Sequence, residues 1–227
     1  RAGERREGVK ARPILFSVEM IRALLAGRKT LTRRIVKPQP DAVHDGDPYW
    51  HIGGYRLRPG AANPLACPHG RPGDLLWCRE SHWRFTGCAE GGKAWPGFID
   101  SPTGSAYDAR CYDDYAQIGA ARMSAAVVRV PSIHMPRWAS RITLLIEDVR
   151  VERLQDISEA DAIAEGCPAV SLHDLDCDST PPSAHFRALW QSLHGPDSWA
   201  ANPWVWRIQF RPILKNVDDY KPQDIAA

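Results

Sequence analysis

Apolar residues recur at helical spacing in two segments of the chain. Between Ser17 and about Ala26 they fall on one face of a predicted helix, formed by Met20, Ile21, Leu24 and Leu25. Ser17 suits the N-cap of this helix, and Gly27 suits the left-handed position just after its end. A second helix is expected over roughly 183–193, with an apolar face formed by Phe186, Leu189, Trp190 and Leu193.

Other segments have the short apolar runs or the alternation that is typical of strands, namely 14–16, 75–80, 141–152 and 204–210. We expect the last of these to close the sheet. Ser158 to Asp161 has the pattern of a capping box, which begins a short helix that Gly166 ends. Because strands and short helices follow in mixed order without βαβ alternation, the sequence predicts an α+β domain built on a curled sheet.

The chain has 227 residues, which is enough for one large domain. We expect a single domain over 12–213, a disordered leader over 1–11 and a C-terminal tail over 214–227. Segments rich in Pro and Gly predict insertions near 38–72 and 84–106, and the first is expected to be irregular rather than packed.

Composition narrows the class of protein. No apolar run reaches the length of a membrane span and no signal-peptide pattern is present, so we expect a cytoplasmic protein. Six cysteines without a C-x-x-C pair predict reduced thiols. Cys67 and His69 could both bind a metal ion, which leaves a metal site open. No second pair of ligands has zinc-finger spacing, so we predict no metal. Without a Gly-rich dinucleotide fingerprint, we also expect no cofactor.

Charge is distributed unevenly along the chain, although the net charge is only +2. Residues 1–37 contain eleven Lys and Arg against three Asp and Glu, whereas residues 145–178 contain two against ten. This asymmetry favours an anionic partner at one face. The alternative is that the basic and acidic segments neutralise each other within the fold.

The segment after the first helix carries the most candidate chemistry, and it reads Gly27-Arg28-Lys29-Thr30-Leu31-Thr32-Arg33-Arg34. Four cations within seven residues create a field that attracts phosphate. The same field lowers the pKa of Lys29, the one amine here that can lose its proton. With Thr32 three residues later, Lys29 is a candidate base beside a candidate nucleophile. The alternative is a solvated basic turn.

Together with motifs elsewhere, this segment resembles the ASCH domain, a member of the PUA-like superfamily. The other matching motifs are Pro72-Gly73-Asp74-x-Leu76-Trp77-x-Arg79-Glu80, the strand before Leu154-x-x-Ile157-Ser158, and Trp204-Val205-Trp206. The chain is most similar to the long ASCH proteins of phages and prophages, in which the segment 131–141 also recurs. The resemblance implies a PUA-like curled β-barrel with flanking short helices, long loop insertions and a cleft for a nucleotide or nucleoside.

The resemblance also implies an activity. Some small ASCH proteins are amidohydrolases that remove the acetyl group from N4-acetylcytidine, and others have been reported to cut RNA. The catalytic set of the amidohydrolases is a Lys, a Thr three residues later and a Glu from a later short helix. By motif, these fall on Lys29, Thr32 and Glu165. This chain is considerably longer than those enzymes, so its insertions could block, reshape or replace their pocket.

Backbone geometry constrains this catalytic set. In an extended strand, residues 29 and 32 point to opposite faces, so Lys29 and Thr32 meet only if 29–31 form a turn. Amide hydrolysis also requires Lys29 to be largely neutral, which means a pKa several units below the ordinary value of about 10.4. Contact with Glu165 would act in the opposite direction.

A second group of candidate binding residues lies in the segment 131–141, and its members are His134, Arg137, Trp138, Ser140 and Arg141. Trp138 offers a face on which a base can stack, and the two arginines are spaced to engage phosphate. In the alternative interpretation, Trp138 seals the end of the barrel and Arg141 pairs with a carboxylate such as Asp74 or Glu80.

Further candidate substrate contacts are Arg28, Arg33 and Arg34 in the basic segment. Arg79 and Glu80 are either substrate contacts or a buried ion pair that supports the cleft. The sequence thus predicts binding of RNA, single-stranded nucleic acid or a modified nucleoside, with hydrolysis of an N-acylated pyrimidine nucleoside as the most concrete activity. Three alternatives remain: a noncatalytic reader of RNA or modified DNA, a ribonuclease, and a phage accessory protein that acts through protein contacts.

Overall fold

The computed structural model describes residues 9–44, 47–52, 55–57, 66–86, 99–100, 126–168 and 180–221. Most of the expected insertion at 84–106 and most of the expected leader therefore lie outside the described residues. The chain divides into two compact units. The first consists of Arg1–Lys10, Ala23–Leu75 and Leu145–Pro212, and the second consists of Ala11–Arg22, Leu76–Leu144 and Ile213–Ala227.

The main sheet has five strands in the order β1-β6-β10-β11-β2. Their bounds are Ala11–Leu15 for β1, Leu75–Arg79 for β6, Thr143–Arg153 for β10, Trp204–Ile213 for β11 and Leu31–Ile35 for β2. With its helices this sheet confirms an α+β fold. The prediction that 204–210 closes the sheet is wrong, because β11 lies between β10 and β2 and the described sheet stays open. One face of β11 carries the buried side chains Trp204, Trp206, Ile208 and Phe210, whereas Arg207, Gln209 and Arg211 on the other face are half-buried.

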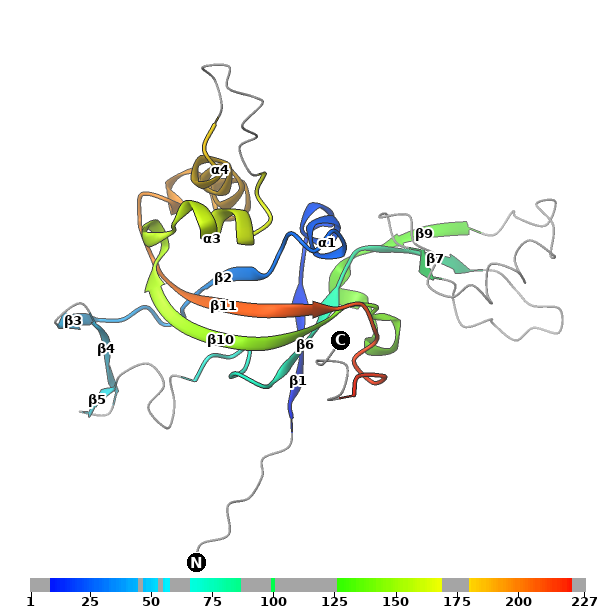
Figure 1. Ribbon diagram of the computed structural model, residues 1–227, viewed down its shortest axis with the longest axis horizontal. Coiled ribbons are helices and arrows are strands. Elements are labelled where there is room, and N and C mark those ends of the chain that lie inside the picture. The colour runs from blue at the N-terminus through cyan, green and yellow to red at the C-terminus, as the bar shows by residue number, and fades with distance from the viewer. Residues whose placement is uncertain are drawn as a thin grey trace, which may run out of the picture. The chain divides into compact units, whose positions relative to one another are not determined.

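The first unit pairs β2 with β11 in antiparallel register, so that Thr32 lies opposite Ile208 and Arg33 opposite Arg207. Two helices, α3 (Glu159–Ala164) and α4 (Pro182–His194), lie beside each other, and α3 contacts β2 (Figure 1). Their apolar sides form one buried cluster with β11 and the end of β10, made of Leu154, Ala162, Cys167, Phe186, Trp190 and Val205. This cluster holds α3 next to β2, and its position brings Glu165 beside Lys29.

Local sequence signals explain where these helices begin and end. The Ser158 hydroxyl accepts the backbone N–H of Asp161 at 3.1 Å, which confirms the predicted N-cap of α3. Gly166 has φ of +97° just after that helix. Helix α1 spans Val18–Leu25 and is followed by Gly27 with φ of +70°, as its sequence predicted. Short 3₁₀ turns, η4 (Leu154–Asp156) and η5 (Pro196–Ser198), complete this unit's connections.

The segment 38–72 is not wholly irregular, and in its described part that prediction is wrong. It contains a small antiparallel sheet in the order β3-β4-β5, with bounds Ala42–His44, Asp47–Ile52 and Tyr55–Leu57. Tyr49 and Trp50 are buried, and the Trp50 indole donates to the carbonyl of Pro38 at 3.0 Å. Two buried aromatic rings provide an apolar anchor, which outweighs the turn-forming composition around them.

The second unit contains another three-stranded sheet, in the order β8-β7-β9. Its strands are β7 (His82–Thr86), β8 (Ile99–Asp100) and β9 (Ala126–Val130). Two 3₁₀ turns follow β9, namely η2 (Ser132–His134) and η3 (Arg137–Ala139). None of the helices in the described ranges combines the length and apolar character that crossing a bilayer requires.

Candidate functional site

Lys29 lies in a turn between α1 and β2. The backbone N–H groups of Arg28 and Lys29 both donate to the carbonyl of Ala23, at 2.9 and 3.2 Å, so the chain folds back on the end of α1. The strand begins only at Leu31. Residues 28–30 therefore lie outside the strand, and Lys29 lies outside the alternation of β2, but Leu31, the last residue of the predicted 29–31 turn, already belongs to β2.

The Lys29 ammonium is fully buried and held by three acceptors. It donates to the carbonyl of Leu31 at 2.9 Å, the carbonyl of Glu165 at 2.7 Å and the Oε2 atom of Glu165 at 2.7 Å. Three short contacts to oxygen atoms match the three donors of a protonated amine. The resting arrangement is therefore an ammonium–carboxylate ion pair, and the amine must lose a proton before it can act as a base.

The surroundings of Lys29 weaken its hold on that proton. Burial lowers the pKa of Lys29, the Glu165 carboxylate opposes this effect, and the nearby Arg34 guanidinium adds to the lowering. This is the direction that the sequence predicted, although the largest cause is burial rather than neighbouring cations. A buried ion pair of this kind lies closer in free energy to its neutral form than an exposed pair does.

Glu165 reaches Lys29 because α3 ends beside the turn. The backbone N–H of Thr30 donates to the carbonyl of Ala164 at 2.8 Å, which joins the turn to the last residue of the helix. Gly166 packs so closely against α1 that a Cβ added to it would lie 2.9 Å from the Cβ of Ala23. The close approach of these backbones sets the position of the Glu165 side chain.

Thr32 is buried in β2, with 2% of its surface exposed. Side chains alternate along a strand, so Thr32 and Arg33 point to opposite faces of β2. The structure therefore brings Lys29 and Glu165 into contact, and no hydrogen bond within the described part of the chain joins Thr32 to either of them.

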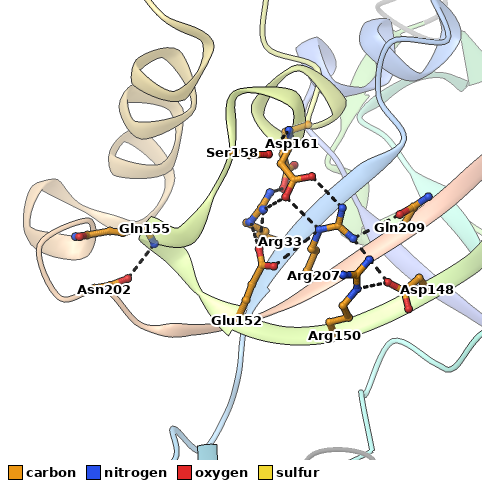
Figure 2. Close-up of polar contacts among 11 residues, drawn as sticks. Arg33, Asp148, Arg150, Glu152, Gln155, Ser158, Asp161, Asn202, Arg207 and Gln209 are labelled. Carbon is orange, nitrogen blue, oxygen red and sulfur yellow. Dashed lines mark hydrogen bonds and ion pairs between the residues drawn. The ribbon is translucent and has the colours of Figure 1, made fainter. Parts of the chain in front are cut away.

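Arg33 is also fully buried, and its guanidinium faces internal carboxylates rather than solvent (Figure 2). Its Nε and Nη2 atoms donate to Glu152 Oε1 at 2.9 and 2.6 Å, and Nη2 also donates to Asp161 Oδ2 at 2.6 Å. Its Nη1 atom lies 3.5 Å from Glu165 Oε1. In this arrangement Arg33 supports the acidic residues, and it does not offer its donors to a phosphate as the sequence suggested.

Arg207 extends this cluster toward the surface (Figure 2). Its guanidinium donates to both oxygens of Asp161, at 2.9 and 3.2 Å, and lies 3.7 Å from Asp148. Through Lys29 and Arg33, the basic segment 1–37 and the acidic segment 145–178 neutralise each other here, which was the second interpretation of the charge asymmetry. Glu152, Asp161 and Arg207 were not predicted from the sequence. The one signal that pointed to the two acidic residues was the excess of Asp and Glu in the segment 145–178.

The carboxylates of the cluster differ in their ionisation. Burial raises the pKa of Glu152, with Arg33 acting against it. The hydrogen bond from Arg207 lowers the pKa of Asp161, and Arg33 contributes in the same direction. Burial and the neighbouring Glu165 charge raise the pKa of the Cys167 thiol to about 11, so this thiol stays protonated and is not a nucleophile.

The remaining basic residues of the segment lie around this site. Arg28 is exposed, and its Nη1 atom donates to the carbonyl of Gly166 at 3.1 Å. Arg34 is half-buried and close enough to Lys29 to influence its charge. These two arginines remain candidate contacts for an anionic ligand.

In the second unit, Glu80 pairs with Arg141 rather than with Arg79. Arg141 Nε and Nη2 donate to the two carboxylate oxygens of Glu80 at 2.9 and 3.0 Å. The predicted Arg79–Glu80 pair is wrong, and the Arg79 guanidinium instead lies 4.7 Å from the Trp77 ring. The alternative in which Arg141 pairs with a carboxylate is confirmed. This bidentate pair is largely buried and supports the loop 131–141.

The loop itself presents Trp138 to solvent, with 63% of the residue exposed, so this indole does not seal the fold. The Asn216 amide donates to the carbonyls of Arg137, Trp138 and Ser140, at 3.1, 3.0 and 2.5 Å. Arg137 also pairs with Asp218 at 2.7 Å. Residues of the expected C-terminal tail therefore hold this loop.

The other predicted residues of this loop have different surroundings. His134 is exposed, whereas the buried Ser140 hydroxyl donates to the carbonyl of Cys78 at 3.0 Å and has a structural role here. No cluster of metal-binding side chains is found within the described ranges, and the thiols of Cys67, Cys78 and Cys167 form no disulfide.

No protein-family model matches the chain, and neither the curated proteins nor the solved structures include a significant match.

Proposed function

We propose that this protein binds a nucleoside or nucleic acid and hydrolyses an N-acylated pyrimidine nucleoside of the N4-acetylcytidine type. The observation that carries the proposal is the fully buried Lys29–Glu165 pair, which lies three residues from a buried threonine hydroxyl. Buried lysines with shifted ionisation are characteristic of sites that move protons. The resemblance of the surrounding motifs to the ASCH domain supplies the substrate class.

The chemistry starts from the ion pair. Proton transfer from Lys29 Nζ to Glu165 Oε2, across 2.7 Å, gives the neutral amine that a base requires. Lys29 then accepts the proton of Thr32 as the threonine oxygen forms a bond to the amide carbonyl carbon. The amide C–N bond breaks, Lys29 returns the proton to the leaving amine, and water hydrolyses the acyl-threonine to release the acid. The proposal requires the Thr32 hydroxyl, which no hydrogen bond among the described residues joins to Lys29, to come within hydrogen-bond reach of Lys29 Nζ in the substrate complex.

We also propose that the fold is PUA-like. The open five-stranded sheet, the long β10 and β11, and the short helices beside β2 are compatible with a curled barrel of this type.

The test of the activity is a screen of N4-acylated cytidines for hydrolysis, using Thr32→Val as the decisive variant. Valine keeps the shape of threonine and removes the hydroxyl, so we expect kcat to fall by more than about 10³-fold. Thr30→Val is the matched control, because it makes the same change at a neighbouring half-buried threonine. Equal rates in Thr32→Val and the wild type contradict the nucleophile assignment.

A second candidate function is a noncatalytic reader of RNA or modified DNA, favoured by the exposed Trp138. An indole held on a clamped loop provides a platform for base stacking, which is worth about 1–3 kcal/mol per base. In this function, binding of single-stranded RNA falls with salt and with Trp138→Ala, and survives Thr32→Val. Binding that does not change in Trp138→Ala contradicts it.

A further inference from the structure

Glu165 is the point at which two buried cations meet. Its Oε2 atom accepts Lys29 and its Oε1 atom faces Arg33 Nη1 at 3.5 Å, so each oxygen has its own cation. The carboxylate is 3% exposed and has almost no contact with water that could hold its orientation. Its rotamer is therefore set by these two partners and by the end of α3.

Arg33 is fixed from three other directions. Glu152 on β10 accepts its Nε and Nη2 atoms, Asp161 on α3 accepts Nη2, and the Phe186 ring on α4 lies 5.7 Å from its Cζ atom. A planar guanidinium held in this way has a defined direction for its remaining Nη1 edge. That edge is directed at Glu165.

We propose that Arg33 is a positioning residue, which orients the Glu165 carboxylate so that one oxygen stays against the Lys29 amine. The proposal rests on the proposed function, in which Glu165 takes the Lys29 proton. Arg33 itself does not contact the reacting atoms. Its role is to keep the distance between Glu165 Oε2 and Lys29 Nζ short enough for proton transfer.

The neighbouring arginine Arg150 offers a matched control. It pairs with Asp148 (Figure 2), and none of its contacts among the described residues is to Glu152, Asp161 or Glu165. Substitution by lysine keeps the charge of either residue and removes its planar fork. Arg33→Lys and Arg150→Lys therefore make the same chemical change, and only the first reaches Glu165.

The first readout does not depend on catalysis. The Lys29 ammonium protons are bonded to three oxygens, so their exchange with water, followed by NMR of the ¹⁵N-labelled chain, is expected to be slow. Arg33→Lys should increase this exchange about tenfold or more, whereas Arg150→Lys should leave it within about twofold. Equal exchange rates in the two variants, or an unchanged rate in Arg33→Lys, overturn the proposal.

The second readout is whether a substitution changes kcat or KM for hydrolysis of the acylated cytidine. Arg33→Lys should lower kcat about tenfold or more with KM nearly unchanged, and Arg150→Lys should change neither by more than about twofold. If the wild type hydrolyses no substrate, the proposed function fails, and the exchange measurement alone decides the role of Arg33. The two failures are thus distinguishable.

Should Arg33→Lys not fold, Glu152→Gln tests the same contact. This change weakens the acceptor of Arg33 Nε and Nη2 at a partly exposed residue and leaves the Arg33 charge in place. Faster exchange of the Lys29 ammonium in Glu152→Gln supports the proposal, and unchanged exchange overturns it.

Discussion

At the scale of single residues, Lys29 determines the character of the site. A lysine without solvent exposure is tolerated only because its three donors have oxygen partners, two of them on Glu165. Stability and the proposed activity therefore depend on the same ion pair. The two requirements can be separated by substitutions that remove one partner or both.

Lys29→Met should destabilise the protein by about 3–5 kcal/mol, because it leaves the Glu165 carboxylate buried without its closest partner. Urea unfolding followed by circular dichroism measures this change. The double variant Lys29→Met/Glu165→Gln should recover part of the loss, since it buries no unpaired carboxylate. A double variant that is less stable than Lys29→Met contradicts the ion pair as described.

Asp161 should make stability depend on acid pH. Its pKa is lowered in the folded protein by the Arg207 hydrogen bond, so its contribution is complete above the unfolded value of about 4 and is lost as pH falls through the folded pKa. The stability difference between the wild type and Asp161→Asn should therefore be largest near neutral pH and shrink in acid. Unfolding free energies between pH 3 and about 7 test this, and a difference independent of pH contradicts it.

At the scale of elements, the contact between the α1–β2 turn and the end of α3 creates the site. Gly166 permits this contact in two ways, because it has positive φ and because a side chain there would meet Ala23. The sequence predicted the first role from the helix C-terminus. It could not predict the second, which depends on two backbones that meet only in the folded chain.

Gly166→Ala should therefore cost more stability than another glycine of similar φ. Gly73 has φ of +90°, and a Cβ there meets no atom within 4 Å. Both substitutions strain the backbone by about 1–3 kcal/mol, and Gly166→Ala adds a clash of similar size. The midpoint of thermal unfolding should be lower for Gly166→Ala than for Gly73→Ala. The double variant Ala23→Gly/Gly166→Ala should recover part of the stability lost in Gly166→Ala. Equal losses without rescue contradict the close approach.

The order of the elements was only partly predictable. Periodicity located α1, α4, β10 and β11 to within a few residues because their apolar faces are long or well bounded. The place of β11 inside the sheet was not predictable, since strand order depends on long-range pairing that the pattern of one strand does not encode. The small β3-β4-β5 sheet was missed because turn-forming residues dominate its sequence.

At the scale of the whole molecule, residues of the basic and acidic segments pair with each other at the candidate site. Lys29 and Arg33 from the basic segment meet Glu152, Asp161 and Glu165 from the acidic one. The sequence offered this neutralisation and an external anion as alternatives, and only spatial proximity could separate them for these residues. Motif matching identified Lys29 and Glu165 as partners, but composition and spacing carried no information about the supporting cluster.

The central claim is that the Lys29 amine moves a proton during hydrolysis. Lys29→Arg tests it most directly, because arginine keeps the buried positive charge and cannot act as a base. With N4-acetylcytidine as substrate and the fold verified by circular dichroism, we expect kcat to fall about 10²–10⁴-fold in Lys29→Arg, while Lys37→Arg, the same change at an exposed lysine, stays close to the wild type. A folded Lys29→Arg variant that hydrolyses the substrate at the wild-type rate would contradict the claim.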